Sequence, residues 1–463
     1  MKRKLLILIL VLFSSGGFGT MTNAQSVRSD AEIRTILQQR IDQEQQSTGI
    51  VVGVIDEQGR RIIGHGTLDR TNSRRVDGNT LFEIGSISKV FTALALVNMA
   101  ERGDLKLNDP ISKFLPKSVK TPTRNGKEIS LLNLATHSSG LPRLPDNFAP
   151  ADMNNPYADY TVEQLYSFLS TYRLPRDIGA QYAYSNLGAG LLGHILSLKA
   201  GVDYETLVKT QIAQPLQMND TRIHLTSDQQ ARFATGHNAL GKPVSHWDLP
   251  TLAGAGALRS TTNDLLKFLA ANLELTSSPL TATLQKTHVV QKQTDTPSLK
   301  IAIGWHSLNQ NGTEIIFHDG GTGGFRSFIG FVKQKRLGVV VLSNSENDIA
   351  DIGLHLLDRR NKLAKHNPPK QRQAVAVDPK LFDAYVGRYE LAPNFILTIT
   401  KEQNRLYAQA TGQPKVELFA ETETQFFITE VDAQITFISD RQGKVNRLIL
   451  HQAGQEIPAK KLD

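Results

Sequence analysis

Strand-like segments lie at both ends of the first three quarters of the chain, and a long helical stretch separates them. Residues 50–55 and 61–65, joined by the turn 56–59, are predicted to form a β-hairpin. The apolar spacing is then mostly helical from about residue 86 to 290. Strand patterns return at 301–305, 314–317, 325–332 and 337–342. This order predicts an α+β fold, in which one antiparallel sheet is assembled from distant segments and helices pack on it.

The last part of the chain has a different pattern. Short alternating segments, separated by polar or glycine-bearing turns at about 8–12 residue intervals, predict a small all-β barrel or sandwich; they are 395–400, 405–410, 415–419, 425–429, 434–438 and 445–450. Residues 359–377 are basic, contain Pro368-Pro369 and are predicted to be a linker. We therefore expect a main domain over 26–358 and an antiparallel β-domain over 378–463.

Residues 1–24 have the pattern of a secretory signal peptide. A basic start is followed by the apolar run 5–13 and a small-residue end, Thr22-Asn23-Ala24. That run is too short to span a bilayer comfortably and no other long apolar stretch follows, so we expect a periplasmic or secreted protein without stable membrane insertion. The net charge of +8, part of it in the leader, is small for this length and indicates no nucleic-acid partner.

Ser86 and Lys89 form the only Ser-x-x-Lys in the chain, at the head of an apolar run that continues to Met99. On a helix, residues three apart share a face, with Cβ atoms about 5–6 Å apart. A serine hydroxyl needs a base to become a nucleophile, and a lysine kept neutral by apolar surroundings can be that base. The alternative is an ordinary helix start with Lys89 in solvent. A helix that is apolar all round argues instead for burial.

Three further motifs follow in order: Leu131–Pro142 (Leu-Leu-Asn-Leu-Ala-Thr-His-Ser-Ser-Gly-Leu-Pro), Tyr184-Ser185-Asn186 and His318-Asp319-Gly320. Together with Phe82–Lys89 (Phe-Glu-Ile-Gly-Ser-Ile-Ser-Lys), they resemble class C β-lactamases and the related penicillin-binding, DD-peptidase-like serine hydrolases. The resemblance covers roughly residues 30–350. It implies a β-lactamase/transpeptidase-like fold, with an antiparallel sheet flanked by helices, an all-α part and the active site between them. The C-terminal segment resembles the lipocalin-like β-domain of some family members.

The resemblance also implies roles for individual residues. Ser86 would attack the substrate carbonyl and form an acyl-enzyme, while Lys89 and Tyr184 exchange the proton. Either could be the base, and a neighbouring ammonium would favour the phenolate form of Tyr184. Asn186 is expected to orient Lys89 or the substrate amide. The backbone N–H groups of Ser86 and Gly321 would form the oxyanion hole.

His318-Asp319-Gly320 departs from the usual Lys-Thr-Gly of the family, and we assign His318 and Gly320 to substrate binding. Lysine supplies a fixed positive charge for a substrate carboxylate, whereas histidine is largely neutral at pH 7. The resemblance implies a β-lactam or a D-Ala-D-Ala-type cell-wall peptide as the substrate class, with an ester or D-amino-acid peptide as the alternative. The neutral histidine argues against efficient penicillin hydrolysis and favours a peptide, D-amino-acid amide or ester. A non-enzymatic alternative is a penicillin-binding sensor that deacylates slowly. No histidine spacing indicates a metal site, and we expect no cofactor.

Overall fold

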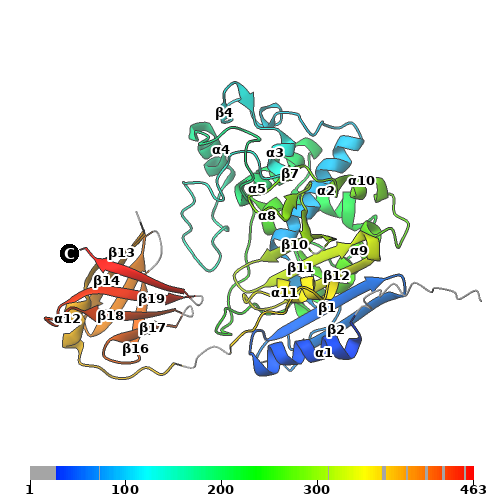
Figure 1. The fold of residues 1–463 in the computed structure, drawn as a ribbon. Helices are drawn as coiled ribbons and strands as arrows, with labels where there is room; N and C mark the ends of the chain where they lie inside the picture. The colour runs from blue at the N-terminus through cyan, green and yellow to red at the C-terminus, as the bar shows by residue number, and fades with distance from the viewer. Residues whose placement is uncertain are drawn as a thin grey trace, which may run out of the picture.

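The computed structural model describes residues 28–71, 73–310, 312–367, 372–392, 395–411, 415–429, 433–452 and 455–462. The predicted signal peptide and the Pro368-Pro369 pair of the linker lie outside these residues. A large domain of sheet and helices is followed by a closed β-barrel, which lies beside it (Figure 1). The expected α+β fold with a C-terminal all-β domain is confirmed.

One eight-stranded antiparallel sheet forms the base of the large domain, in the order β2-β1-β12-β11-β10-β9-β8-β7. Its strands are β1 (Gly49–Asp56), β2 (Gly59–Gly66), β7 (Lys292–Gln293), β8 (Leu299–Ile301), β9 (His306–Gln310), β10 (Thr313–Gly321), β11 (Arg326–Val332) and β12 (Leu337–Ser343). The predicted hairpin is β1–β2, and β1 pairs with β12, with Ile50 opposite Ser343. The expectation that distant segments share one sheet is therefore confirmed.

Two details of the predicted strands are wrong. Residues 301–305 are not one strand, because β8 ends at Ile301 and β9 begins at His306, with a turn between them in which Gly304 has φ +78°. Residues 318–321, which lie beyond the strand predicted over 314–317, instead continue β10. The second difference matters for the site, because a strand turns successive side chains to opposite faces.

The sheet is apolar on both faces in its centre, which explains why β12 is a continuous apolar run. Val339 and Val341 face a core shared with α1 and α11, whereas Val340 and Leu342 face the larger core shared with α2 and α9. The helices are α1 (Asp30–Gln38), α2 (Ser88–Glu101), α3 (Leu131–Ala135), α4 (Val162–Thr171), α5 (Asn186–Ala200), α6 (Tyr204–Val208), α7 (Ser227–Ala231), α8 (Ala253–Gly256), α9 (Thr262–Asn272), α10 (Thr281–Thr287), α11 (Ala350–Leu357) and α12 (Phe382–Tyr385). Two-stranded pairs β3 (Leu81–Glu83) with β6 (Arg259–Thr261) and β4 (Thr123–Arg124) with β5 (Lys127–Glu128) lie among them. Figure 1 shows α3, α4 and α5 in a helical part that is drawn above α8 and above β10 of the sheet.

The C-terminal barrel is closed by eight antiparallel strands. They are β13 (Gly387–Ala392), β14 (Phe395–Glu402), β15 (Arg405–Ala410), β16 (Val416–Ala420), β17 (Gln425–Ile428), β18 (Ala433–Ser439), β19 (Val445–Gln452) and β20 (Gln455–Lys461). The six strands predicted from the sequence are β14–β19, and the two that close the barrel, β13 and β20, were missed. Lys242 of the large domain donates to the carbonyl of Thr429 in the barrel, at 2.9 Å. No helix in the described ranges is both long and apolar enough to cross a membrane.

Candidate active site

Ser86 lies in a 3₁₀ turn, Gly85–Ile87, that leads directly into α2. Lys89 Nζ lies 2.8 Å from Ser86 Oγ and 2.7 Å from the carbonyl oxygen of Ala255. The Lys89 side chain is only 3% exposed, because α2 is buried on almost every side. The structure therefore supports the buried serine–lysine pair and excludes the alternative in which Lys89 extends into solvent.

The surroundings of Lys89 favour its neutral form. Burial lowers the pKa of Lys89 well below its usual value, the positive charge of Arg143 lowers it further, and Asp319 opposes the shift. A carbonyl oxygen only accepts hydrogen bonds, so the amine donates to Ala255. A neutral amine that donates to Ala255 still has its lone pair free to accept the Ser86 hydroxyl proton.

Tyr184, in the segment before α5, lies next to the Ser86–Lys89 pair. Lys89 Nζ lies 4.9 Å from the centre of the Tyr184 ring. Burial raises the pKa of Tyr184 strongly, although its hydrogen bond with Ser86 opposes that shift. The expectation that a neighbouring ammonium favours the phenolate is therefore not met, because burial disfavours both the lysine ammonium and the tyrosine anion.

Asn186 is the first residue of α5, and its position is fixed by its neighbours. The Ser185 hydroxyl caps the helix by accepting from the N–H of Gly188 at 2.8 Å, and the Ser185 N–H donates to His137 Nδ1 at 3.2 Å. Asn186 Nδ2 donates to the Tyr157 hydroxyl at 3.1 Å. Its Oδ1 is buried, and among the described residues it has no hydrogen-bond partner. Since buried polar atoms are normally paired, this oxygen is available to a substrate N–H.

The third motif places alternate side chains on opposite faces of β10. His318 is 2% exposed, and its Nδ1 donates to the carbonyl of Asp319 at 2.6 Å. Burial lowers the pKa of His318 well below its usual value, so the imidazole is neutral. Its ring packs behind Tyr184, with ring centres 6.4 Å apart, and does not line the catalytic pocket. Asp319 lines the pocket instead, and burial together with Asp348 raises the pKa of its carboxyl group.

Gly320 and Gly321 press against the turn that carries the nucleophile. A Cβ on Gly85 would lie 2.7 Å from the nitrogen of Gly321, and a Cβ on Gly320 would lie 3.0 Å from the nitrogen of Ser86. Only glycines permit this approach of two backbones, and Gly85 also has φ +49°. The turn that carries Ser86 and the end of β10 that carries Gly321 are thereby held against each other, and both residues line the pocket.

The catalytic pocket has a volume of about 580 Å³ and contains residues that the sequence did not indicate. They are Arg143, Tyr157, Tyr182, Trp247, His306, Arg326 and Asp348. The Arg143 guanidinium lies 5.3 Å from the centre of the Tyr184 ring, and within the described ranges no carboxylate forms an ion pair with it. His306 bonds the Tyr182 hydroxyl at 3.0 Å, and burial lowers the pKa of His306 to about 4. Most of these residues lie in loops without a periodic pattern, so no local signal identified them.

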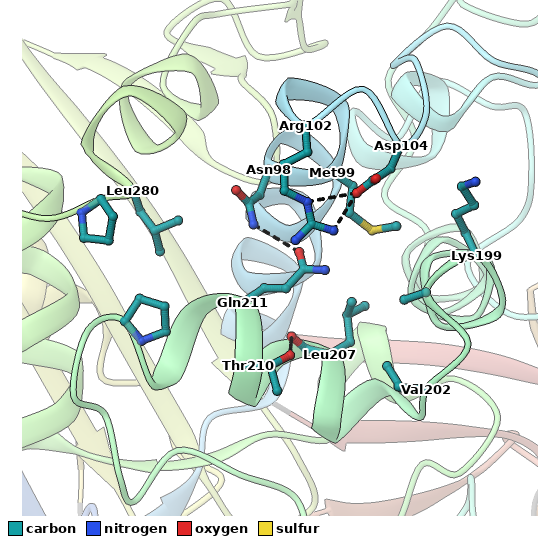
Figure 2. Close-up of a pocket in the computed structure, with 13 residues that line it drawn as sticks. Asn98, Met99, Arg102, Asp104, Lys199, Val202, Leu207, Thr210, Gln211 and Leu280 are labelled. Carbon is teal, nitrogen blue, oxygen red and sulfur yellow. Dashed lines mark hydrogen bonds and ion pairs between the residues drawn. The ribbon is translucent and has the colours of Figure 1, made fainter.

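A second hollow, of about 610 Å³, lies at the far end of α2 (Figure 2). Figure 2 shows two side-chain pairs in it: Arg102 pairs with Asp104 at 2.5 Å, and Asn98 donates to Gln211 at 3.1 Å. At a rise of 1.5 Å per residue, Asn98 lies roughly 18 Å along the chain from Ser86. This hollow contains no nucleophile with a base. Across the described part of the chain, no group of three histidine or acidic side chains could hold a metal ion.

Comparison with known proteins agrees with this geometry. A family model described as "Beta-lactamase" matches residues 33–359, and a "Domain of unknown function (DUF3471)" matches residues 371–461. The D-alanyl-D-alanine-carboxypeptidase/endopeptidase AmpH of Escherichia coli K12 is 31% identical over 311 residues, which cover 64% of this chain and 79% of AmpH. Penicillin-binding protein 4* of Bacillus subtilis is 27% identical over 436 residues, covering 87% of this chain and 93% of that protein.

Solved structures give the same result. A β-lactamase/D-alanine carboxypeptidase from Yersinia pestis has a TM-score of 0.63 at 25% identity and covers 71% of this chain and 96% of its own. A class C β-lactamase from Rhodobacter sphaeroides has a TM-score of 0.62 at 27% identity, covering 72% and 98%. The resemblance drawn from the motifs is thus confirmed over the large domain. The chain belongs to the β-lactamase family and is a serine hydrolase that acts through an acyl-enzyme.

Proposed function

We propose that the protein is an exported peptidase of the D-Ala-D-Ala type that also reacts with β-lactams. The observation that carries the proposal is the buried Lys89 amine, 2.8 Å from Ser86 Oγ and with a lowered pKa. This arrangement supplies an activated nucleophile without a histidine or a metal. The named activities of the carboxypeptidase and β-lactamase relatives support the same substrate class.

The proposed reaction uses Lys89 as the base. Neutral Lys89 accepts the hydroxyl proton as Ser86 Oγ bonds to the substrate carbonyl carbon. The carbonyl oxygen becomes an oxyanion between the N–H groups of Ser86 and Gly321. Tyr184, a neutral phenol, then gives its proton to the leaving nitrogen as the C–N bond breaks, and it receives one from the Lys89 ammonium. Water hydrolyses the acyl ester by the same steps in reverse.

Arg143 is proposed to take over the carboxylate-binding role that the family's third-motif lysine performs. His318 is neutral and lies beneath the pocket, so it has no charge for a substrate carboxylate. Arg143 lines the pocket beside Tyr184 and carries a permanent charge. His318 then acts from behind the pocket by supporting the Tyr184 ring. Gly320, which lines the pocket, allows the strand to approach Ser86.

The test compares an acetylated peptide ending in D-Ala-D-Ala with the same peptide ending in a carboxamide. A charge-assisted hydrogen bond contributes about 1.5–3 kcal/mol, so Arg143→Gln should lower kcat/KM for the acid relative to the amide roughly 10- to 100-fold. Nitrocefin and p-nitrophenyl acetate are assayed in parallel, with Ser86→Ala as the inactive control. An unchanged acid-to-amide ratio would remove Arg143 from carboxylate recognition. Turnover of p-nitrophenyl acetate alone would make the protein an esterase.

Covalent labelling tests the identity of the nucleophile independently of the substrate. A fluorescent penicillin should modify the wild-type protein at Ser86 and leave Ser86→Ala unmodified, as peptide mass mapping would show. Label on another residue would contradict the assignment of Ser86. A stable label without turnover of any of the four substrates would indicate the slowly deacylating sensor.

A further inference from the structure

A cavity of about 920 Å³ lies between the large domain and the end of the barrel. It adjoins the catalytic pocket, because Trp247 lines both hollows. Two consecutive residues line one hollow each: Thr322 lines the catalytic pocket, and Gly323 lines the cavity. Gly323 contacts the indole closely, since a Cβ on it would lie 2.7 Å from Trp247 Nε1. Trp247 therefore forms the wall around which a molecule held at Ser86 would pass into the cavity.

The two ends of the barrel interior are filled differently. At one end four aromatic rings pack together: Tyr385, Tyr389, Phe426 and Phe437. At the other end, towards the large domain, the inward positions of β15 and β18 are alanines, Ala408, Ala410 and Ala433. An eight-stranded barrel has an interior just wide enough to be filled by side chains or to hold one small ligand. Among the described residues, the small side chains of these alanines leave space at that end of the barrel, and this space is part of the cavity.

Most of the wall on the barrel side is apolar. It comprises the three alanines with Leu391, Phe395, Leu397, Val416, Ile428, Ile435 and Leu450. Phe395 is 36% exposed, and on the opposite side Met153 of the large domain is 49% exposed. Exposed large apolar side chains that line one cavity from both domains indicate a binding surface for an apolar group. A cavity of this size lies within the range that encloses a drug-sized ligand.

We propose that this cavity binds the apolar tail of a further class of substrate, amphiphilic amides or esters, and that the tail is a straight-chain acyl or alkyl group of eight or more carbons. The carbonyl of such an amphiphilic amide or ester would lie at Ser86, and its chain would extend past Trp247 into the alanine-lined end of the barrel. The statement that the bound molecule is hydrolysed at Ser86 rests on the proposed hydrolase function. The statement that the cavity binds an apolar chain rests on the cavity alone.

Binding is tested in the full-length Ser86→Ala protein, which does not turn over. The probe is N-phenyl-1-naphthylamine, whose fluorescence rises in apolar sites, and dodecanoate is the competitor. Ala410 is half-buried and lines the cavity, so the ring of Ala410→Phe would fill part of it. Gln409→Phe adds the same ring at the neighbouring position on the same strand, which is exposed and does not line the cavity. Ala410→Phe should weaken probe and dodecanoate binding at least tenfold, and Gln409→Phe should leave both unchanged. Equal binding by both variants would overturn the proposal.

Catalysis is tested with p-nitrophenyl esters of two to twelve carbons, below their micelle concentrations. Burial of each methylene can raise kcat/KM up to about fourfold, so the wild type should prefer the octanoate and dodecanoate esters. Ala410→Phe should remove this preference and leave acetate hydrolysis unchanged. Hydrolysis without any dependence on chain length would overturn the inference and leave the proposed function intact. Probe binding without hydrolysis of any ester, of the D-Ala-D-Ala peptide or of nitrocefin would support the cavity and refute the proposed function.

Discussion

Replacing Gly85 with alanine is expected to remove most of the catalytic rate while leaving the chain folded. The new Cβ would lie 2.7 Å from the nitrogen, 2.8 Å from the oxygen and 3.0 Å from the carbonyl carbon of Gly321. These are backbone atoms of β10, so the contact is relieved only if the strand end moves away from the turn. That movement separates the N–H groups of Gly321 and Ser86.

The magnitude follows from two separate costs. Alanine at φ +49° adopts a left-handed conformation that costs about 1–2 kcal/mol of stability. Displacing one oxyanion donor costs about 10²–10³ in kcat, which corresponds to roughly 2.7–4 kcal/mol of transition-state stabilisation. The first cost appears in the free energy of unfolding, whereas the second appears only in the rate.

Gly201→Ala separates the two costs. Gly201 has φ +69° at the end of α5, and a Cβ there would meet no atom within 4 Å. It should therefore share the conformational cost and retain full activity. The assay is kcat for nitrocefin and p-nitrophenyl acetate, with urea unfolding of both variants and the wild type. The reasoning is refuted if Gly85→Ala keeps kcat within tenfold of the wild type, or if Gly201→Ala loses as much rate.

Four further outcomes are expected. Arg143→Gln removes a cation that lowers the pKa of Lys89, so the acidic limb of the pH profile of kcat/KM should move to higher pH. Arg143→Lys should return the limb to its wild-type position, and an unmoved limb in Arg143→Gln would mean that another group is the base. The pKa of Lys89 is lower in the folded than in the unfolded chain, so the free energy of unfolding of the wild type should rise with pH below about 10, by up to about 1.4 kcal/mol per pH unit. Lys89→Met should abolish this rise, which urea unfolding at pH 7 and at pH 9 would measure. Phe426→Ala, in the aromatic end of the barrel, should cost about 3–5 kcal/mol and lower the calorimetric transition of the barrel alone; a shift of both transitions would show one cooperative unit. Protein secreted with its own leader should start at or near Gln25 by intact mass, about two dozen residues short, and full-length chain in the membrane fraction would contradict export.

The parts of the site that lie on one regular element could be predicted from the sequence. Ser86 and Lys89 share a helix start, and their spacing alone places them on one face. Six barrel strands were likewise visible, because their alternation is local. The closing strands were harder to recognise: β20 contains Pro458, and β13 is only partly apolar.

The parts that depend on register or on long-range packing could not be predicted. Which face His318 presents is decided by the pairing of β10 with β9 and β11, and a shift of one residue would exchange it with Asp319. The protonation of Tyr184 depends on how deeply the fold buries it, which no local pattern records. Arg143 and Trp247 lie on loops, and only the folded structure brings them to the same pocket.

The pairing of β1 with β12 has a consequence for how the chain is made. The two strands lie roughly 290 residues apart, so their contact has a high loop-closure cost and forms late. A chain that emerges amino terminus first must therefore wait with the apolar edge of β1 exposed until β12 arrives. An open edge of this kind can pair with another copy, so the unfinished chain would aggregate unless a chaperone covers it. The barrel differs, because almost all of its strands pair with the next one along the chain and can fold as they appear.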